Sequence, residues 1–217
     1  MSAALRDDLV FVYRELARLG LNQASTGNVS AREGAGMVIT PSGCDADTVS
    51  AEGMVAMGLD GVSQSPSKPS SEWHMHAAIY LADPRARAIV HTHSDACTAL
   101  ACLGEDLPAF HYMIASFGGD EVRCAPYATF GTAELAPLAV AAIAGRSACL
   151  LANHGVIVHA ATPRLALRQM ILLETLARQF LLARSAGVPR ILNAAEMEGA
   201  HRRFRTYGQQ ARSAEEQ

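Results

Sequence analysis

Two histidines one residue apart, His91 and His93, end the short apolar and β-branched run 87–90. A run of this kind predicts a strand, and side chains two apart on a strand point to the same face, about 6.6 Å apart at ~3.3 Å per residue. Two imidazoles so placed can bind one divalent metal ion, because each forms a bond of about 2.0–2.1 Å. An isolated pair of this kind is more often exposed or hydrogen-bonded, so the rest of the chain must supply further ligands.

Two further residues fit such a metal site. His154 follows a second strand-like run, 148–153, and precedes Gly155, where the backbone can turn sharply beside a ligand. Glu72 opens a segment upstream of the histidine pair. Three histidines and a carboxylate are typical of a zinc site that keeps positions for exchangeable ligands, which points to catalysis. The predicted zinc ligands are Glu72, His91, His93 and His154.

The other histidines lack this context. Glu72 and His76 are four apart on a predicted helix and form a competing pair, but the second histidine of the helical metalloprotease motif is missing. His74 lies early in the same predicted helix, and the single histidines His111, His159 and His201 are predicted to be structural or solvated.

Composition limits the functional classes that the chain can belong to. Its 217 residues predict a single domain, 1–217, with 50% hydrophobic and 18% charged residues. A formal net charge of −3 argues against nucleic-acid binding, and no apolar stretch reaches the ~20 residues that span a membrane. The N-terminus leads into a charged segment rather than a signal peptide. Five cysteines without a CxxC pair indicate reduced thiols, so we expect a cytoplasmic protein.

The pattern of elements predicts a mixed or antiparallel sheet covered by helices, because several connections are too short for parallel crossovers. Thr132 is predicted to cap one helix that runs toward Gly145. Thr162 and Pro163 are predicted to start a long helix that ends near Ala186. Helices are also expected up to about residue 19 and over 72–81, strands over 25–32, 37–40 and 87–93, and a loop over 60–70.

Three short segments share a chemistry suited to an anion: 27–28, 40–43 and 70–71. Each offers small residues, backbone N–H groups and hydroxyls, and the last one precedes the helix that Glu72 opens. The first N–H groups of a helix have no partner within the helix and favour an anion. A phosphate can be held in this way without lysine or arginine. Each segment alone is typical of a plain turn or cap, but together they indicate a phosphorylated substrate whose reacting end faces the metal.

These motifs resemble the class II aldolase/adducin family, and in particular its fuculose-phosphate aldolase branch. The resemblance covers nearly the whole chain. The His-x-His pair, the lone histidine and the Ser-Ser-Glu element mark the whole family, whereas two runs are more particular to the branch. The matching segments are 20–23, 27–30, 39–43, 69–73, 90–93, 108–115, 124–132, 154–155 and 204–208.

The resemblance implies a three-layer α/β/α fold around a central, mostly antiparallel sheet, in a homotetramer with shared active sites. Zinc would be bound by the three histidines, with Glu72 as a fourth ligand in the empty site and as the acid/base once substrate binds. Tyr112 matches a tyrosine that reaches into a neighbouring subunit's site. Residues that match the phosphate site are Asn28, Ser42, Gly43, Ser70 and Ser71. Residues that match the aldehyde end are Phe130, Phe204 and Tyr207.

The activity that the resemblance implies is retro-aldol cleavage of L-fuculose 1-phosphate, or a similar ketose 1-phosphate, to dihydroxyacetone phosphate and L-lactaldehyde, in fucose degradation. Zinc would act as a Lewis acid on the C2 carbonyl and C3 hydroxyl oxygens. Glu72 would remove the C3 proton in the synthetic direction, and Tyr112 would protonate the aldehyde oxygen. Lys68 is the only lysine and lies in a Ser/Pro-rich loop, which argues against a Schiff-base aldolase.

Two alternatives remain open from the sequence. Another phosphosugar enzyme of the same superfamily, such as a pentulose-5-phosphate 4-epimerase, a decarboxylase or a dehydratase, would share the zinc and phosphate sites. A non-catalytic interaction domain like the adducin head would have the fold without the metal, and the intact ligand set argues against it.

Overall fold

A seven-stranded sheet forms the middle layer of the computed structural model, which describes residues 3–206. The strand order is β3-β2-β1-β4-β7-β6-β5, and each neighbouring pair is antiparallel except β5 and β6. The mostly antiparallel sheet predicted from the sequence is thus confirmed. The strands are β1 (Asn28–Glu33), β2 (Gly36–Ile39), β3 (Val55–Gly58), β4 (Ala88–Thr92), β5 (Cys124–Ala125), β6 (Ala148–Leu151) and β7 (Gly155–Ala160).

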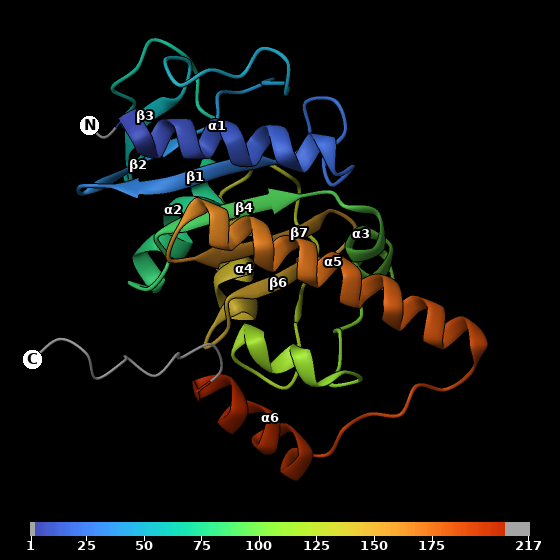
Figure 1. The fold of residues 1–217 in the computed structure, drawn as a ribbon. Helices are drawn as coiled ribbons and strands as arrows, with labels where there is room; N and C mark the ends of the chain where they lie inside the picture. The colour runs from blue at the N-terminus through green and yellow to red at the C-terminus, as the bar shows by residue number, and fades with distance from the viewer. Residues whose placement is uncertain (1–2, 207–217) are drawn as a thin grey trace, which may run out of the picture.

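Helices cover both faces of the sheet, as expected for an α/β/α fold (Figure 1). Helices α1 (Ala3–Arg18), α3 (Asp95–Cys102) and α5 (Pro163–Ala186) pack on one face. Helices α2 (Trp73–Ala82) and α4 (Leu135–Ile143) pack on the other. Helix α6 (Ala194–Thr206) contacts the 3₁₀ helix η1 (Tyr112–Phe117). No helix within residues 3–206 combines the length and the apolar character needed to cross a membrane.

Successive side chains of the central strands point to opposite faces of the sheet, so the hydrophobic core consists of two clusters, one on each face. Ala88 and Val90 of β4 face α1, α3 and α5, whereas Ile89 faces α2 and α4. Because both faces are covered, β4 is buried along its whole length, which explains its continuous apolar run. His91 is two residues after Ile89 on the same strand, so its side chain lies on the face that α2 covers.

The predicted helix starts had different outcomes. Pro163 begins α5, and Thr162 Oγ1 accepts a hydrogen bond from the backbone N–H of Leu165 at 3.2 Å, so this prediction is confirmed. The predicted cap at Thr132 is wrong. Glu134 precedes the first helical residue of α4, and the Thr132 hydroxyl donates instead to the Thr129 carbonyl, 2.7 Å away in the preceding turn.

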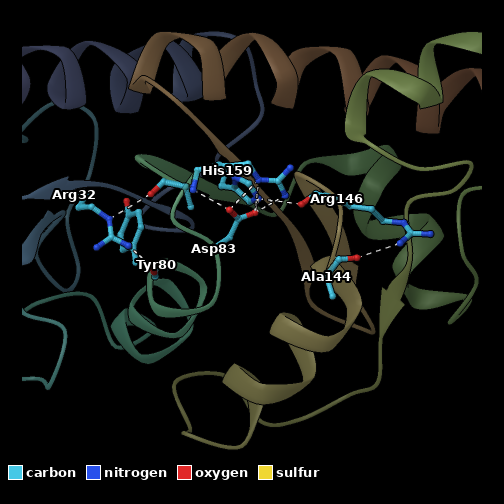
Figure 2. A network of polar contacts seen from close by, with 8 residues as sticks. Arg32, Tyr80, Asp83, Ala144, Arg146 and His159 are labelled. Carbon is cyan, nitrogen blue, oxygen red and sulfur yellow. Dashed lines mark hydrogen bonds and ion pairs between the residues drawn. The ribbon is translucent and has the colours of Figure 1, made fainter. Parts of the chain in front are cut away.

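Polar contacts link α2 to the sheet at the end of β7 that lies away from the predicted metal ligands (Figure 2). His159 Nε2 donates to the Arg146 carbonyl at 3.0 Å and lies 3.6 Å from Asp83 Oδ2. Arg32 of β1 donates to the Tyr80 carbonyl of α2. These contacts join the last turn of α2 to the sheet, so the helix is held by directional bonds as well as by apolar packing.

Replacing Thr162 with alanine should lower the free energy of unfolding by about 1 kcal/mol, because the first turn of α5 loses its side-chain cap. Urea denaturation of both proteins measures this difference. Thr132→Ala is the matched control, since Thr132 caps no helix and its loss should cost clearly less. Equal losses for the two variants would contradict the capping role.

Candidate metal centre

Three imidazoles meet at one end of the central strands. His91 is on β4, His93 follows that strand directly, and His154 lies in the turn between β6 and β7. Their ring centroids form a nearly equilateral triangle with sides of 4.9, 4.8 and 4.9 Å, and the ring planes are inclined by 69–78°. The Nε2 atoms of His91 and His93 are 3.1 Å apart. The histidine part of the predicted site is therefore assembled in the fold.

Glu72 completes the cluster from the residue before α2. Its Oε2 lies 3.0 Å from His91 Nε2, and its Oε1 lies 3.1 Å from His154 Nε2. The carboxylate is buried and also accepts a hydrogen bond from Asn28 Nδ2 at 2.9 Å. The ligand atoms of all four residues lie within 4.8 Å of one another.

The electrostatics of the cluster favour a positive charge at its centre. Burial disfavours the ionised form of Glu72, yet the His91 and His154 imidazoles outweigh it and hold the pKa of the carboxyl well below its usual range. Burial opposes protonation of His91, but the Glu72 carboxylate nevertheless raises the pKa of that imidazole. Burial, together with His91 and His154, lowers the pKa of His93 to about 4, so His93 is neutral at pH 7.

The tautomer of His91 is fixed by the sheet. Its Nδ1–H donates to the Val156 carbonyl at 2.9 Å, which leaves the lone pair of Nε2 pointing at Glu72. A lone pair that faces a carboxylate oxygen is repelled unless a proton or a cation lies between them. Four ligands with tetrahedral bonds of ~2.0–2.1 Å would be about 3.3–3.4 Å apart. Three of the ligand-atom separations, 3.0–3.1 Å, are close to this value. The cluster thus suits a divalent metal ion.

Two turn residues allow His93 and His154 to converge. A side chain at Gly155 would lie 2.4 Å from the Thr92 carbonyl oxygen and 3.0 Å from His93 Cδ2, so only glycine fits between these strands. Asn153 takes a left-handed conformation with a φ of 53°, which asparagine tolerates better than most residues. This tight turn projects His154 toward the end of β4.

A cavity of about 420 Å³ opens beside the metal ligands. The segments around Ser42 and Ser70 lie next to each other on its wall, joined by a hydrogen bond from the Ser42 N–H to the Lys68 carbonyl (3.0 Å) and one from the Ser70 N–H to the Thr40 carbonyl (3.0 Å). The cavity is lined by the five residues predicted for the phosphate together with three of the metal ligands. They are Asn28, Ser42, Gly43, Ser70, Ser71, Glu72, His93 and His154.

The residues predicted for the aldehyde end are dispersed. Phe130 lines the cavity beside the metal ligands. Tyr112 and Phe204 stack on each other with ring centroids 6.3 Å apart and line a different cavity, between η1 and α6. Tyr112 is 54% exposed, and Tyr207 lies outside the described residues. Within one chain the structure therefore does not bring Tyr112 or Phe204 to the metal cluster.

Sequence reasoning gave no site role to five residues that line the main cavity: Ser25, Thr26, Tyr127, Ala128 and Asn153. Asn153 directly precedes the predicted ligand His154 and Gly155, and an asparagine before a glycine-containing turn was a usable signal. Tyr127 is 61% exposed on the loop that precedes Phe130 and belongs to no periodic pattern. Its segment, 124–132, was matched only as part of the family resemblance, which gave Tyr127 itself no role.

Comparison with known proteins agrees with this geometry. The profile of the Class II Aldolase and Adducin N-terminal domain family matches residues 7–181. A 5-methylthioribulose-1-phosphate/5-deoxyribulose-1-phosphate aldolase of Rhodospirillum rubrum is 45% identical over 208 residues, covering 96% of this chain and 94% of that protein. The L-fuculose phosphate aldolase of Escherichia coli K12 is 42% identical, covering 89% of this chain and 91% of that protein.

A solved structure of an L-fuculose 1-phosphate aldolase superposes with a TM-score of 0.91 at 38% identity, covering 94% of this chain and 98% of that one. The residues of the metal cluster fall inside the matched family profile. From the fold, the ligand cluster and these relatives we conclude that the chain belongs to the class II aldolase family.

Proposed function

We propose that this aldolase uses zinc to cleave a ketose 1-phosphate into dihydroxyacetone phosphate and a small aldehyde, in the cytoplasm. One observation carries the proposal: Glu72 and His154 share a cavity with the hydroxyls and N–H groups of residues 42–43 and 70–71. Such a cavity can hold a phosphate at one end and the reacting carbons at the other. Imidazole and carboxylate ligands in a four-residue cluster are those that zinc prefers in catalytic sites.

Three substrates have support from relatives of similar identity. The sequence predicts L-fuculose 1-phosphate, which agrees with the name of the Escherichia coli relative. The name of the Rhodospirillum rubrum relative favours 5-methylthioribulose 1-phosphate and 5-deoxyribulose 1-phosphate as the other two candidates. All three compounds carry the phosphate on C1 and end in a carbon without a hydroxyl. They would place the same dihydroxyacetone phosphate half in the cavity and differ only in the aldehyde that leaves.

Glu72 is the proposed acid/base. A bound zinc ion would supply Lewis-acid stabilisation of the negative charge that develops as the C3–C4 bond breaks. In the cleavage direction the electron pair of that bond passes to the dihydroxyacetone phosphate half, and C3 then takes a proton. The Glu72 carboxyl group, held by Asn28 beside the cluster, is placed to deliver that proton and to remove it in the reverse direction.

The leaving aldehyde end is proposed to be completed by a neighbouring subunit of a homotetramer. Tyr112 and Phe204 are grouped together away from the cavity of their own chain, which fits residues that act on a neighbour's substrate. Tyr112 would donate a proton to the aldehyde oxygen or accept one from it. Phe130, from the chain that supplies the metal ligands, and Tyr207 would contact the apolar end of the aldehyde.

The test of the function is a cleavage assay with the three ketose 1-phosphates, coupled to detection of dihydroxyacetone phosphate. Absence of cleavage with all three, by zinc-loaded protein, would refute the proposal.

Replacing His91 with alanine should abolish zinc binding and activity together, because the cluster loses a buried ligand whose orientation the Val156 carbonyl fixes. Metal content after dialysis, measured by atomic emission, tests this. His74→Ala is the control, since His74 lies two residues past Glu72 but outside the cluster and should leave one zinc per chain. Full zinc occupancy in His91→Ala would show that the ligand set is wrong.

Glu72→Gln keeps the shape of the side chain but removes the base, so exchange of the C3 proton of dihydroxyacetone phosphate should slow by about 10²–10⁴. Proton NMR in deuterated buffer, at saturating zinc, measures this exchange. If the glutamine variant exchanged the proton at the parent rate, the acid/base would have to be another residue.

Tyr112→Phe should slow cleavage and synthesis far more than it slows proton exchange, because only the carbon–carbon step needs a proton on the aldehyde oxygen. Mixing Tyr112→Phe subunits with His91→Ala subunits tests where the tyrosine acts. Sites shared between subunits should regain part of the activity, since some of them then combine an intact cluster with an intact tyrosine. No recovery after demonstrated subunit exchange would assign Tyr112 to its own subunit's site.

A further inference from the structure

Polar residues of β1 contact polar residues of α2 at regular intervals. Asn28 Nδ2 donates to Glu72 Oε2 at 2.9 Å, and Arg32 donates to the Tyr80 carbonyl. Between them, Ser30 Oγ lies 2.7 Å from His76 Nδ1 and 2.8 Å from the Tyr80 hydroxyl. We call this set the β1–α2 column. Its members are Asn28, Ser30 and Arg32 from β1, and Glu72, His76 and Tyr80 from the α2 segment.

The column follows from the geometry of its two elements. Its strand residues are two apart and lie on one face, about 6.6 Å per step. Its helix residues are four apart and lie on one side of α2, about 6.0 Å per step. Because these steps nearly match, one strand face can contact three successive turns of a helix that runs alongside it. A slip of one residue along α2 would rotate the helix by about 100° and break each contact.

The middle of the column contains no solvent-exposed group. Ser30 and His76 are fully buried, and Tyr80 is 1% exposed. The Ser30 hydroxyl joins the other two side chains, so its loss would leave a buried imidazole nitrogen and a buried phenol hydroxyl without this partner. The apolar residues of α2, such as Met75 and Ile79, contribute non-directional packing, which does not fix the position of a helix along its axis.

The first contact of the column is at the metal cluster. Glu72 directly precedes α2, and none of the α2 backbone N–H groups is capped by its side chain. The position of its carboxylate therefore depends on where α2 lies, on Asn28 and on the two histidines that it faces. Displacements of about 1 Å at a catalytic group can cost 10²-fold in rate.

We propose that Ser30, His76 and Tyr80 are positioning residues that fix the register of α2 on β1 and thereby place the Glu72 carboxylate against His91 and His154. The kinetic part of this inference rests on the proposed role of Glu72 in proton transfer. The structural part concerns only the placement of a metal ligand, so it can be tested without any substrate.

The first experiment measures zinc affinity by competition with a chromogenic chelator. Ser30→Ala removes the hydroxyl that bridges His76 and Tyr80, whereas Tyr80→Phe removes only the Tyr80 hydroxyl. Both variants should bind zinc at least about 10-fold more weakly than the parent, as seen when groups that support a metal ligand are lost. Tyr13→Phe is the matched control. Its buried hydroxyl donates to the Cys44 carbonyl at 2.7 Å on the opposite helical layer, so it loses an equivalent bond without touching α2.

The second experiment asks whether the column acts through Glu72. At saturating zinc, Ser30→Ala should reduce C3 proton exchange by about 10-fold in the parent, with KM unchanged, because the acid/base is displaced while the phosphate residues stay in place. In the Glu72→Gln background the same substitution should have an effect smaller than about twofold, since the group that it positions is already gone. A purely structural role predicts no change of rate in either background.

Zinc affinities of Ser30→Ala and Tyr80→Phe equal to that of Tyr13→Phe would overturn the proposal. So would full additivity of Ser30→Ala and Glu72→Gln in the exchange rate. If the parent cleaved none of the ketose 1-phosphates, the proposed function would fail, yet the affinity measurement would still decide whether the column places Glu72.

Discussion

The structure depends on one buried carboxylate. Glu72 is placed among three imidazoles at the end of the central strands, where an isolated negative charge would be costly. The cost is offset because His91 and His154 face its two oxygens and Asn28 donates to one of them. Each of these contacts comes from a different part of the chain, so the carboxylate is stable only when the sheet, the β6–β7 turn and α2 are all in place.

The sheet explains why these parts meet. In the antiparallel pairing of β1 with β4, Asn28 lies opposite His91, and β7 runs back beside β4 so that Val156 reaches the His91 ring. The same pairing leaves the segments around Ser42 and Ser70 on the wall of the neighbouring cavity. One set of strand registers thus positions both the metal ligands and the groups proposed for the phosphate.

Much of this arrangement could be predicted from local patterns. The spacing of His91 and His93, and the position of His154 before Gly155, were sufficient to propose a common metal site. The pairing of Asn28 with His91 was not predictable, because strand register is a tertiary property that no single segment encodes. The predicted cap at Thr132 failed for a local reason, because its hydroxyl donates to the Thr129 carbonyl in the preceding turn instead of accepting from an N–H group at the start of α4. Tyr112 lines a different cavity from the metal ligands of its own chain, and no local pattern around it indicates that separation.

The amine chemistry of this chain is unusually restricted. Lys68 is the only lysine, its side chain is exposed, and its carbonyl accepts the hydrogen bond from Ser42 at the edge of the main cavity. An amine-directed fluorophore would therefore have one side-chain attachment point in the whole chain. That point is next to the segments proposed for the phosphate, so the label would serve as an environment-sensitive reporter of cavity occupancy without an engineered cysteine.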